Sequence, residues 1–70
     1  DGITYAIQCK RYDSPVGIDA VQQVYAGRAY YECHVAMVLT KQYFTGSARK
    51  LADKIGVVLW DRDMLEELLQ

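Results

Sequence analysis

Gln8 and Lys10 interrupt an apolar run, ITYAIQCKRY at residues 3–12, that otherwise has the composition of a buried strand. Their positions differ by two, so in an extended chain both side chains leave the same face. Burying an amide without a hydrogen-bond partner costs about 2–7 kcal/mol, and burying an ammonium costs more. The two side chains therefore either face water or do chemistry. In the second case, an ammonium can stabilise negative charge and an amide oxygen can bind a hard cation.

The cysteines and the histidine predict neither a metal site nor a nucleophile. Cys9 and Cys33 form no CxxC pair, and the single histidine, His34, does not complete a zinc site. Cys33 and His34 are neighbours, and neighbours in a strand point to opposite faces, which is a poor arrangement for proton transfer. Cys9 lies inside the apolar run, where we expect a small buried hydrophobic side chain.

Length and composition indicate one small globular domain. Its 70 residues are 51% hydrophobic, and a chain of this size buries only about 60% of its unfolded surface. The net charge of −1 excludes a uniformly basic surface, but residues 1–54 carry seven Lys/Arg against five Asp/Glu, which permits a local basic patch. Nothing resembles a signal peptide or an apolar span of about 18 residues, so a reducing, cytoplasmic location is expected.

The first half of the chain alternates between strand and helix patterns. Residues 3–10 predict a strand that ends at the turn signal DSPVG, and a helix is expected to begin near residues 16–19. The continuous apolar run HVAMVLT at residues 34–40 is typical of a strand covered on both sides. Apolar residues recur at helical spacing between these strands: Val16, Ala20, Val21, Val24 and Tyr25.

The second half continues this alternation. Hydroxyl and glycine residues at 45–47 predict a helix start, and Gly56 is a natural residue to follow its end. The run VVLW at residues 57–60 predicts a short buried strand. Asp61 can cap a last helix over residues 62–69 and is expected to do so rather than to bind a metal.

The element order β-α-β-α-β-α predicts an α/β fold. Strands separated by helices of this length imply right-handed crossovers and a small, mostly parallel sheet flanked by helices. The first residues, DGI, resemble the second half of a β-turn, with Gly2 at a position that needs an unusual backbone conformation. We therefore expect residues 1–70 to be a single partial domain that begins within a hairpin.

Several short motifs follow one another in a fixed order along the chain. They are IQCKRY, a Pro-Val pair, VQQVYAG, a threonine followed closely by FTGSA, and LWDRD. From about Tyr5 to Leu68 this ordered set resembles the catalytic domain of Mrr-type (type IV) restriction endonucleases, in the PD-(D/E)xK nuclease superfamily. The resemblance implies a restriction-endonuclease-like core of the QxK variety that lacks its N-terminal helix and first hairpin strand. It also implies metal-dependent hydrolysis of DNA.

The resemblance implies roles for single residues. Gln8 and Lys10 match the catalytic strand, in which Gln8 helps to hold Mg²⁺ and Lys10 acts at the reacting water or phosphate. Gln22 matches a glutamine that faces the site from the following helix, and the alternative is an ordinary solvated helix position. The family also has a metal-binding aspartate farther upstream than the seven residues that precede Gln8. Hydrolysis through metal-activated water needs that carboxylate, so these residues alone are expected to be inactive.

Four more residues are candidates for contacts with double-stranded DNA. Arg11 and Tyr12 follow the first strand, where such side chains often contact phosphate or sugar, and a solvated strand end is the alternative. Thr40 ends the second predicted strand, where ligands commonly meet a parallel sheet. Lys41 stands where the family often has asparagine, which can alter a DNA-facing loop. The exposed sheet edge suggests a homodimer.

Two other functions stay open on the sequence alone. A DNA-binding module that kept the fold but lost cleavage predicts binding that weakens with salt and needs no Mg²⁺. A protein-interaction domain in which Gln8 and Lys10 are merely exposed predicts no measurable DNA affinity. Trp60 closes an apolar strand and is expected in the core rather than as a platform for base stacking.

Overall fold

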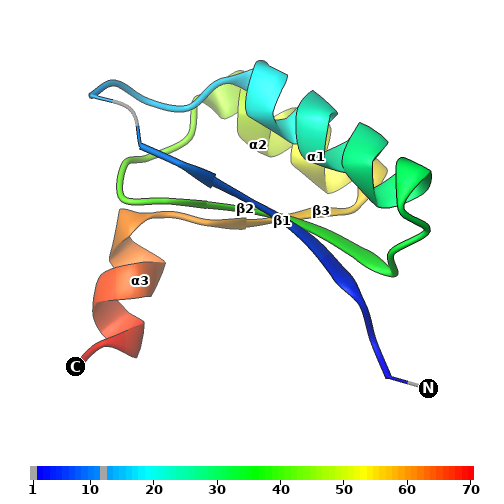
Figure 1. The fold of residues 1–70 in the computed structure, drawn as a ribbon. Helices are drawn as coiled ribbons and strands as arrows, with labels where there is room; N and C mark the ends of the chain where they lie inside the picture. The colour runs from blue at the N-terminus through cyan, green and yellow to red at the C-terminus, as the bar shows by residue number, and fades with distance from the viewer. Residues whose placement is uncertain (1, 12) are drawn as a thin grey trace.

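The computed structural model describes residues 2–11 and 13–70 and contains the predicted elements in the predicted order. The strands form one parallel sheet with β2 in its centre (Figure 1). The α/β prediction, with a three-stranded parallel sheet flanked by helices, is confirmed. The elements are β1 (Tyr5–Lys10), α1 (Ile18–Tyr30), β2 (Val35–Thr40), α2 (Gly46–Ile55), β3 (Val57–Trp60) and α3 (Arg62–Leu68).

The strand register aligns the carboxyl ends of the three strands. Lys10, the last residue of β1, pairs with Thr40, the last residue of β2. Leu39 pairs with Trp60, the last residue of β3. Residues that follow the strands therefore come together at one edge of the sheet, on the left of Figure 1.

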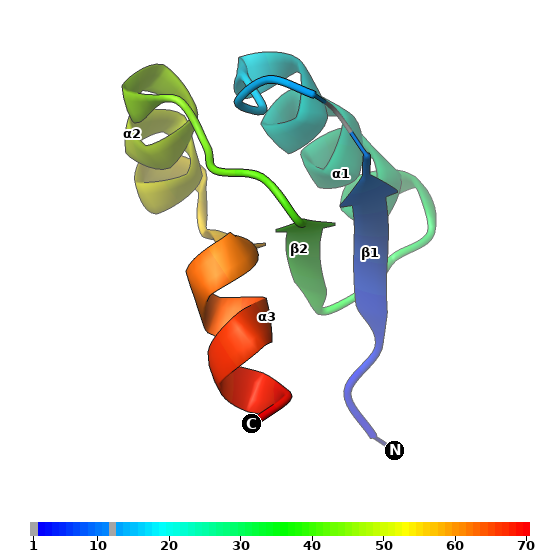
Figure 2. The same ribbon diagram turned by 90° about the vertical axis from the view of Figure 1, so that its left-hand side faces the viewer.

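Helices α1 and α2 cover one face of the sheet, and α3 lies by the other face near the end of β3 (Figures 1 and 2). The core lies between the sheet and the first two helices, because apolar residues at helical spacing meet every second residue of the strands. Its buried residues are Val16, Ala20, Val21, Val24, Ala36, Val38, Phe44, Ala48, Ala52 and Val57.

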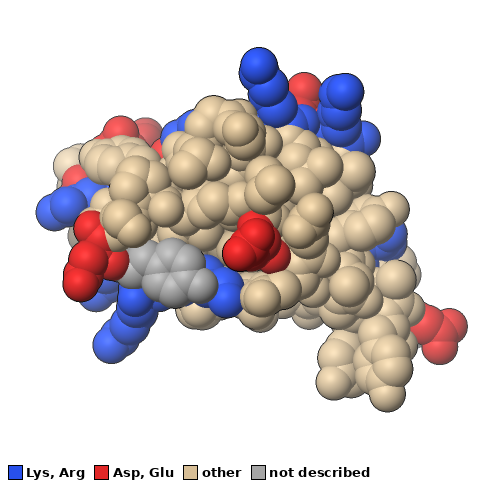
Figure 3. All heavy atoms as spheres, turned by 90° about the horizontal axis from the view of Figure 1, so that it is seen from above, with Lys and Arg blue, Asp and Glu red and all other residues tan. Residues whose placement is uncertain are grey.

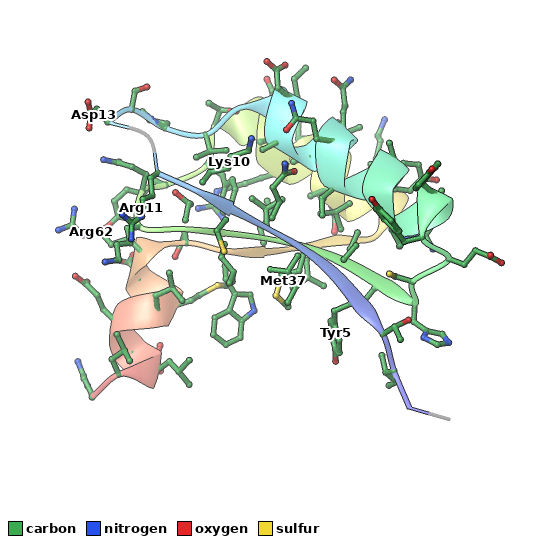
Figure 4. All side chains as sticks on the ribbon, viewed as in Figure 1. Tyr5, Lys10, Arg11, Asp13, Met37 and Arg62 are labelled. Carbon is green, nitrogen blue, oxygen red and sulfur yellow. The ribbon has the colours of Figure 1, made fainter. Side chains whose placement is uncertain are left out.

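The other face of the sheet is largely open in the described residues. Tyr5 and Met37 point away from α1 and α2 in Figure 4, and Tyr5 is 50% exposed. Buried and half-buried residues alternate along β2, so the expectation that this strand is covered on both sides is wrong. Cys9 is exposed, and its predicted burial is wrong for the same reason: its side chain leaves the strand on the open face.

The helix ends follow the predicted caps. The Thr45 hydroxyl accepts a hydrogen bond from the Ala48 N–H at 3.1 Å at the start of α2. Gly56 ends this helix with φ of 76°, a left-handed conformation that costs glycine little because it has no Cβ. Gly2 has φ of 132°, so the predicted unusual backbone conformation is present at this residue, and the turn itself stays a prediction. Helix α1 begins within the predicted range, after Gly17, which has no side chain to cap it.

Candidate active site

Gln8 and Lys10 lie on the face of β1 that α1 covers, and both are half-buried. Lys10 extends from the end of β1 toward α1 (Figure 4). The prediction that both side chains leave the strand on one face is confirmed, because they contact the same atom of Gln23 on α1.

Gln23 fixes the orientation of both polar side chains. Its Oε1 accepts a hydrogen bond from Gln8 Nε2 at 3.1 Å and another from Lys10 Nζ at 3.0 Å. An ammonium only donates hydrogen bonds, so the atom of Gln23 that faces Lys10 must be its carbonyl oxygen. The atom of Gln8 that faces this oxygen must then be its amide nitrogen. The direction of the Gln8 carbonyl therefore follows from the charge on Lys10.

The carbonyl oxygen of Gln8 is buried and has no hydrogen-bond partner. A buried acceptor left in this state costs about 1–3 kcal/mol, and such groups in folded proteins often mark a functional position. Gln8 also lines a groove of about 230 Å³ between β1 and α1, together with Gln23 and Tyr31. The site thus offers an unused oxygen ligand beside a groove and close to a cation.

Three of the predicted DNA-contact residues, Arg11, Thr40 and Lys41, lie at the carboxyl ends of β1 and β2. Arg11 and Lys41 are exposed, and with Lys10 they line two shallow hollows of about 200 and 300 Å³. Thr40 is buried, and its Oγ1 accepts a hydrogen bond at 3.1 Å from the backbone N–H two residues later. Thr40 therefore shapes the loop after β2. Tyr12 lies outside the described residues.

Comparison with known proteins identifies the family. The chain matches the family model of the Mrr restriction endonuclease catalytic domain over residues 1–69. The chain belongs to this family. No curated protein and no solved structure matches it. The resemblance found in the ordered motifs is confirmed, and it covers nearly the whole chain. In the part of the chain that the structure describes, no helix is long and apolar enough to cross a membrane.

Restriction endonucleases are typically metal-dependent, so the residues of this Mrr-type domain can be tested as metal ligands. The unpartnered oxygen of Gln8 suits one ligand position of a hard cation. A complete site needs further donors, and within residues 2–11 and 13–70 no group of three or more His, Cys, Asp or Glu could hold a metal ion. The described residues thus supply one ligand and do not form a metal site by themselves.

Gln22, the glutamine predicted to face the site, is exposed on α1, and the hydrogen bonds to Gln8 and Lys10 are made by its neighbour Gln23. One residue corresponds to a turn of about 100° around a helix. Both glutamines are exposed, but Gln23 lies three residues after the buried Ala20, on the side of α1 that borders β1. In the sequence, Gln23 follows the apolar Ala20 by three residues, and this helical spacing is the signal that could have placed it on the side of α1 next to the sheet. A role for Gln22 in this Mrr-type domain stays a prediction.

Asp61 has the predicted structural role. Its Oδ1 accepts a hydrogen bond from the Met64 N–H at the start of α3, and its Oδ2 pairs with Arg49 at 3.0 Å. Burial raises the pKa of Asp61, but the hydrogen bonds from Arg49 and Met64 outweigh it and hold the pKa below the usual value. Trp60 is half-buried, beside Met64 on the open face of the sheet, so the expectation of a core position holds only in part.

Proposed function

We propose that this Mrr-type domain hydrolyses DNA phosphodiester bonds with Mg²⁺, and that Gln8 and Lys10 meet the scissile phosphate. Family membership supports the class of enzyme. One observation supports the site: an amide and an ammonium on the same strand face share one acceptor, and the amide oxygen is left without a partner. An ordinary exposed strand face would not hold these groups between a strand and a helix.

Lys10 supplies the positive charge at the phosphate. Its side chain is half-buried, and a charge acts more strongly there than in bulk water. The hydrogen bond to Gln23 orients the ammonium before substrate arrives, so little reorganisation is needed when negative charge develops on the phosphate. Mg²⁺, when bound, lowers the pKa of a water molecule, and Gln8 Oε1 is one of its ligands. The family resemblance implies an acidic ligand in addition to Gln8.

Double-stranded DNA reaches this site across the carboxyl ends of β1 and β2. Arg11 and Lys41 are exposed there and can contact phosphates. Tyr12 keeps its predicted role as a DNA contact, whereas the buried Thr40 acts through the shape of the loop that carries Lys41. The same proposal includes a homodimer through the outer edge of β1, which is an edge strand of the described sheet. It also includes a location in the cytoplasm.

The test is cleavage of supercoiled plasmid with Mg²⁺ by the natural full-length protein and its Lys10→Ala variant. Loss of one group that stabilises transition-state charge typically lowers a rate by about 100- to 1,000-fold, and we expect a loss of this size. Lys10→Met keeps the apolar stem and controls for packing. Lys54→Ala, at an exposed position in the last turn of α2, controls for loss of a surface charge.

Cutting by Lys10→Ala at the wild-type rate would remove the central assignment. Folding is checked in parallel, because the free energy of unfolding should change by no more than about 0.5 kcal/mol. Salt-sensitive binding of DNA by the wild type, without any cutting in Mg²⁺, would instead identify a non-cleaving DNA-binding module.

A further inference from the structure

Cationic side chains follow the carboxyl end of every strand. Lys10 ends β1 and Arg11 follows it, Lys41 comes directly after β2, and Arg62 begins α3 two residues after β3. Because the strands are parallel, these positions share one edge of the sheet. Figure 4 shows Arg11 and Arg62 at this same end of the molecule.

Three hollows join these side chains along the edge. Lys41 lines all three of these hollows, Lys10 and Arg11 line two, and Arg62 lines the third, which has a volume of about 390 Å³. Hollows that share lining residues adjoin one another. Together they form a shallow depression from the end of β1 to the start of α3, which we call the carboxyl-edge depression.

Positive charge exceeds negative charge in the carboxyl-edge depression, although the whole chain has a net charge of −1. Its four cations face two lining carboxylates, Asp13 and Glu66. Glu66 Oε2 lies 3.4 Å from Arg62 Nε, but both side chains are more than half exposed. An ion pair this exposed contributes little to stability, so little holds Arg62 in it. Seen from above, the molecule carries Lys and Arg around its rim with acidic residues among them (Figure 3).

Two other carboxylates near this edge are already engaged. Asp61 pairs with Arg49, and Asp63 accepts a hydrogen bond from the Tyr43 hydroxyl at 2.8 Å. That hydrogen bond raises the pKa of the Tyr43 hydroxyl. The charge of Asp61 is therefore offset by Arg49, whereas Asp63 keeps its negative charge and has one oxygen held by Tyr43.

We propose that Lys41 and Arg62 extend the active site into a continuous phosphate-binding surface, so that one DNA backbone runs along the carboxyl-edge depression from Lys10 to Arg62. This inference rests on the proposed function and adds Arg62 as a positioning residue. The guanidinium fork of arginine suits phosphate oxygens. The backbone N–H of Arg62 donates a hydrogen bond to the backbone carbonyl of Gln42 at 2.9 Å. This bond holds the start of α3 against the loop that carries Lys41.

Contacts to phosphate place DNA without reading its sequence, and each one makes binding more sensitive to salt. The test therefore uses Arg62→Gln and Lys41→Gln in the full-length protein. Binding to two labelled duplexes of unrelated sequence is measured in EDTA, between about 50 and 200 mM salt. Matched controls are Arg28→Gln and Lys54→Gln, in the last turns of α1 and α2 at the opposite end of the sheet.

Each test variant should reduce the slope of log affinity against log salt by about one and weaken binding to both duplexes equally. The controls should keep the wild-type slope, and Arg62→Lys, which retains the charge, should restore it. A slope equal to that of the controls would overturn the proposal, as would a loss confined to one duplex, which indicates a base contact.

The cutting assay separates this inference from the proposed function. If Lys10→Ala still cuts DNA but Arg62→Gln lowers the salt slope, the catalytic assignment fails and the phosphate-binding surface stands. If Lys10→Ala abolishes cutting but Arg62→Gln binds with the wild-type slope, only the path of the DNA is wrong.

Discussion

The covered face of the sheet is used in opposite ways by β1 and β2. On β2 the covered face carries Ala36 and Val38, both fully buried, which is the usual pattern of apolar residues turned toward a covering helix. On β1 the covered face carries Gln8 and Lys10, while Ile7 lies on the open face and is 54% exposed. On the covered face, the edge strand therefore reverses the polarity that its neighbour shows there.

This reversal separates the part of the molecule that stabilises the fold from the part that acts. Helices α1 and α2, strands β2 and β3, and the loop residues Val16 and Phe44 supply the core, and β1 adds to it only through Ala6, which is partly buried. Holding an amide and an ammonium between a strand and a helix costs free energy that an apolar pair would not. In return the two groups have a fixed orientation and reduced screening, which a solvated face does not provide.

The first prediction tests whether the two faces differ in solution as they do in the structure. Val38 is 0% exposed under the helices, and Val58 is 38% exposed on the open face. Val38→Ala should lower the free energy of unfolding by about 2–3 kcal/mol, because it removes buried groups and leaves a cavity. Val58→Ala should cost less than about 1 kcal/mol. Urea denaturation followed by circular dichroism measures both, and equal losses would contradict the comparison.

The second prediction tests the contact that holds the polar pair. Gln23→Leu removes the shared acceptor of Gln8 and Lys10, so DNA cutting by the full-length protein should fall by about tenfold or more, as with other residues that orient metal-site groups. Gln22→Leu on the same helix tests the role that the sequence predicts for Gln22: loss of cutting would support that role, and an unchanged rate would contradict it.

Gln23→Glu keeps an acceptor oxygen and should recover part of the activity. In NMR spectra, the side-chain amide signals of Gln8 should shift in Gln23→Leu but not in Gln22→Leu. If Gln22→Leu lost activity and Gln23→Leu did not, the glutamine predicted from the sequence would be the correct one after all.

The comparison also explains what the sequence could predict. Local signals determine the helix limits, because Thr45 and Asp61 cap helices and Gly56 ends one through contacts within a few residues. The family motifs located Gln8 and Lys10 on one strand face. Pairing with Gln23 depends on how α1 is rotated against β1, which packing decides, and an error of one residue moves a side chain by about 100°.

The open face was harder to predict for a different reason. An apolar run such as HVAMVLT has the same composition whether one or both faces of its strand are covered. The exposure of Cys9 follows from this ambiguity. The role inferred for Arg62 also depended on topology, because only the parallel register places it at the same edge as Lys10.

The last prediction, which has the smallest expected effect, compares substitutions of Asp61 and Gln8. Both Asp61 oxygens are engaged, by Met64 and by Arg49, whereas Gln8 Oε1 has no partner. The pKa of Asp61 is lowered in the folded protein although burial opposes this, because the two hydrogen bonds are stronger. A carboxyl with a depressed folded pKa contributes stability above its unfolded pKa, near 3.9, and this contribution is lost as pH falls through the folded pKa.

Asp61→Asn keeps an oxygen that can cap α3 but removes the charge that pairs with the half-exposed Arg49. The variant should lose about 1 kcal/mol at pH 7, and its deficit should shrink as pH falls below about 4. Gln8→Leu removes an unpartnered buried oxygen but also the hydrogen bond that Nε2 donates to Gln23. These two effects oppose each other, so stability should change by no more than about 0.5 kcal/mol at any of these pH values. Urea denaturation at neutral and acid pH measures both variants. A larger loss for Gln8→Leu than for Asp61→Asn would mean that the amide stabilises the fold, and the reversed pattern of β1 would then need no functional explanation.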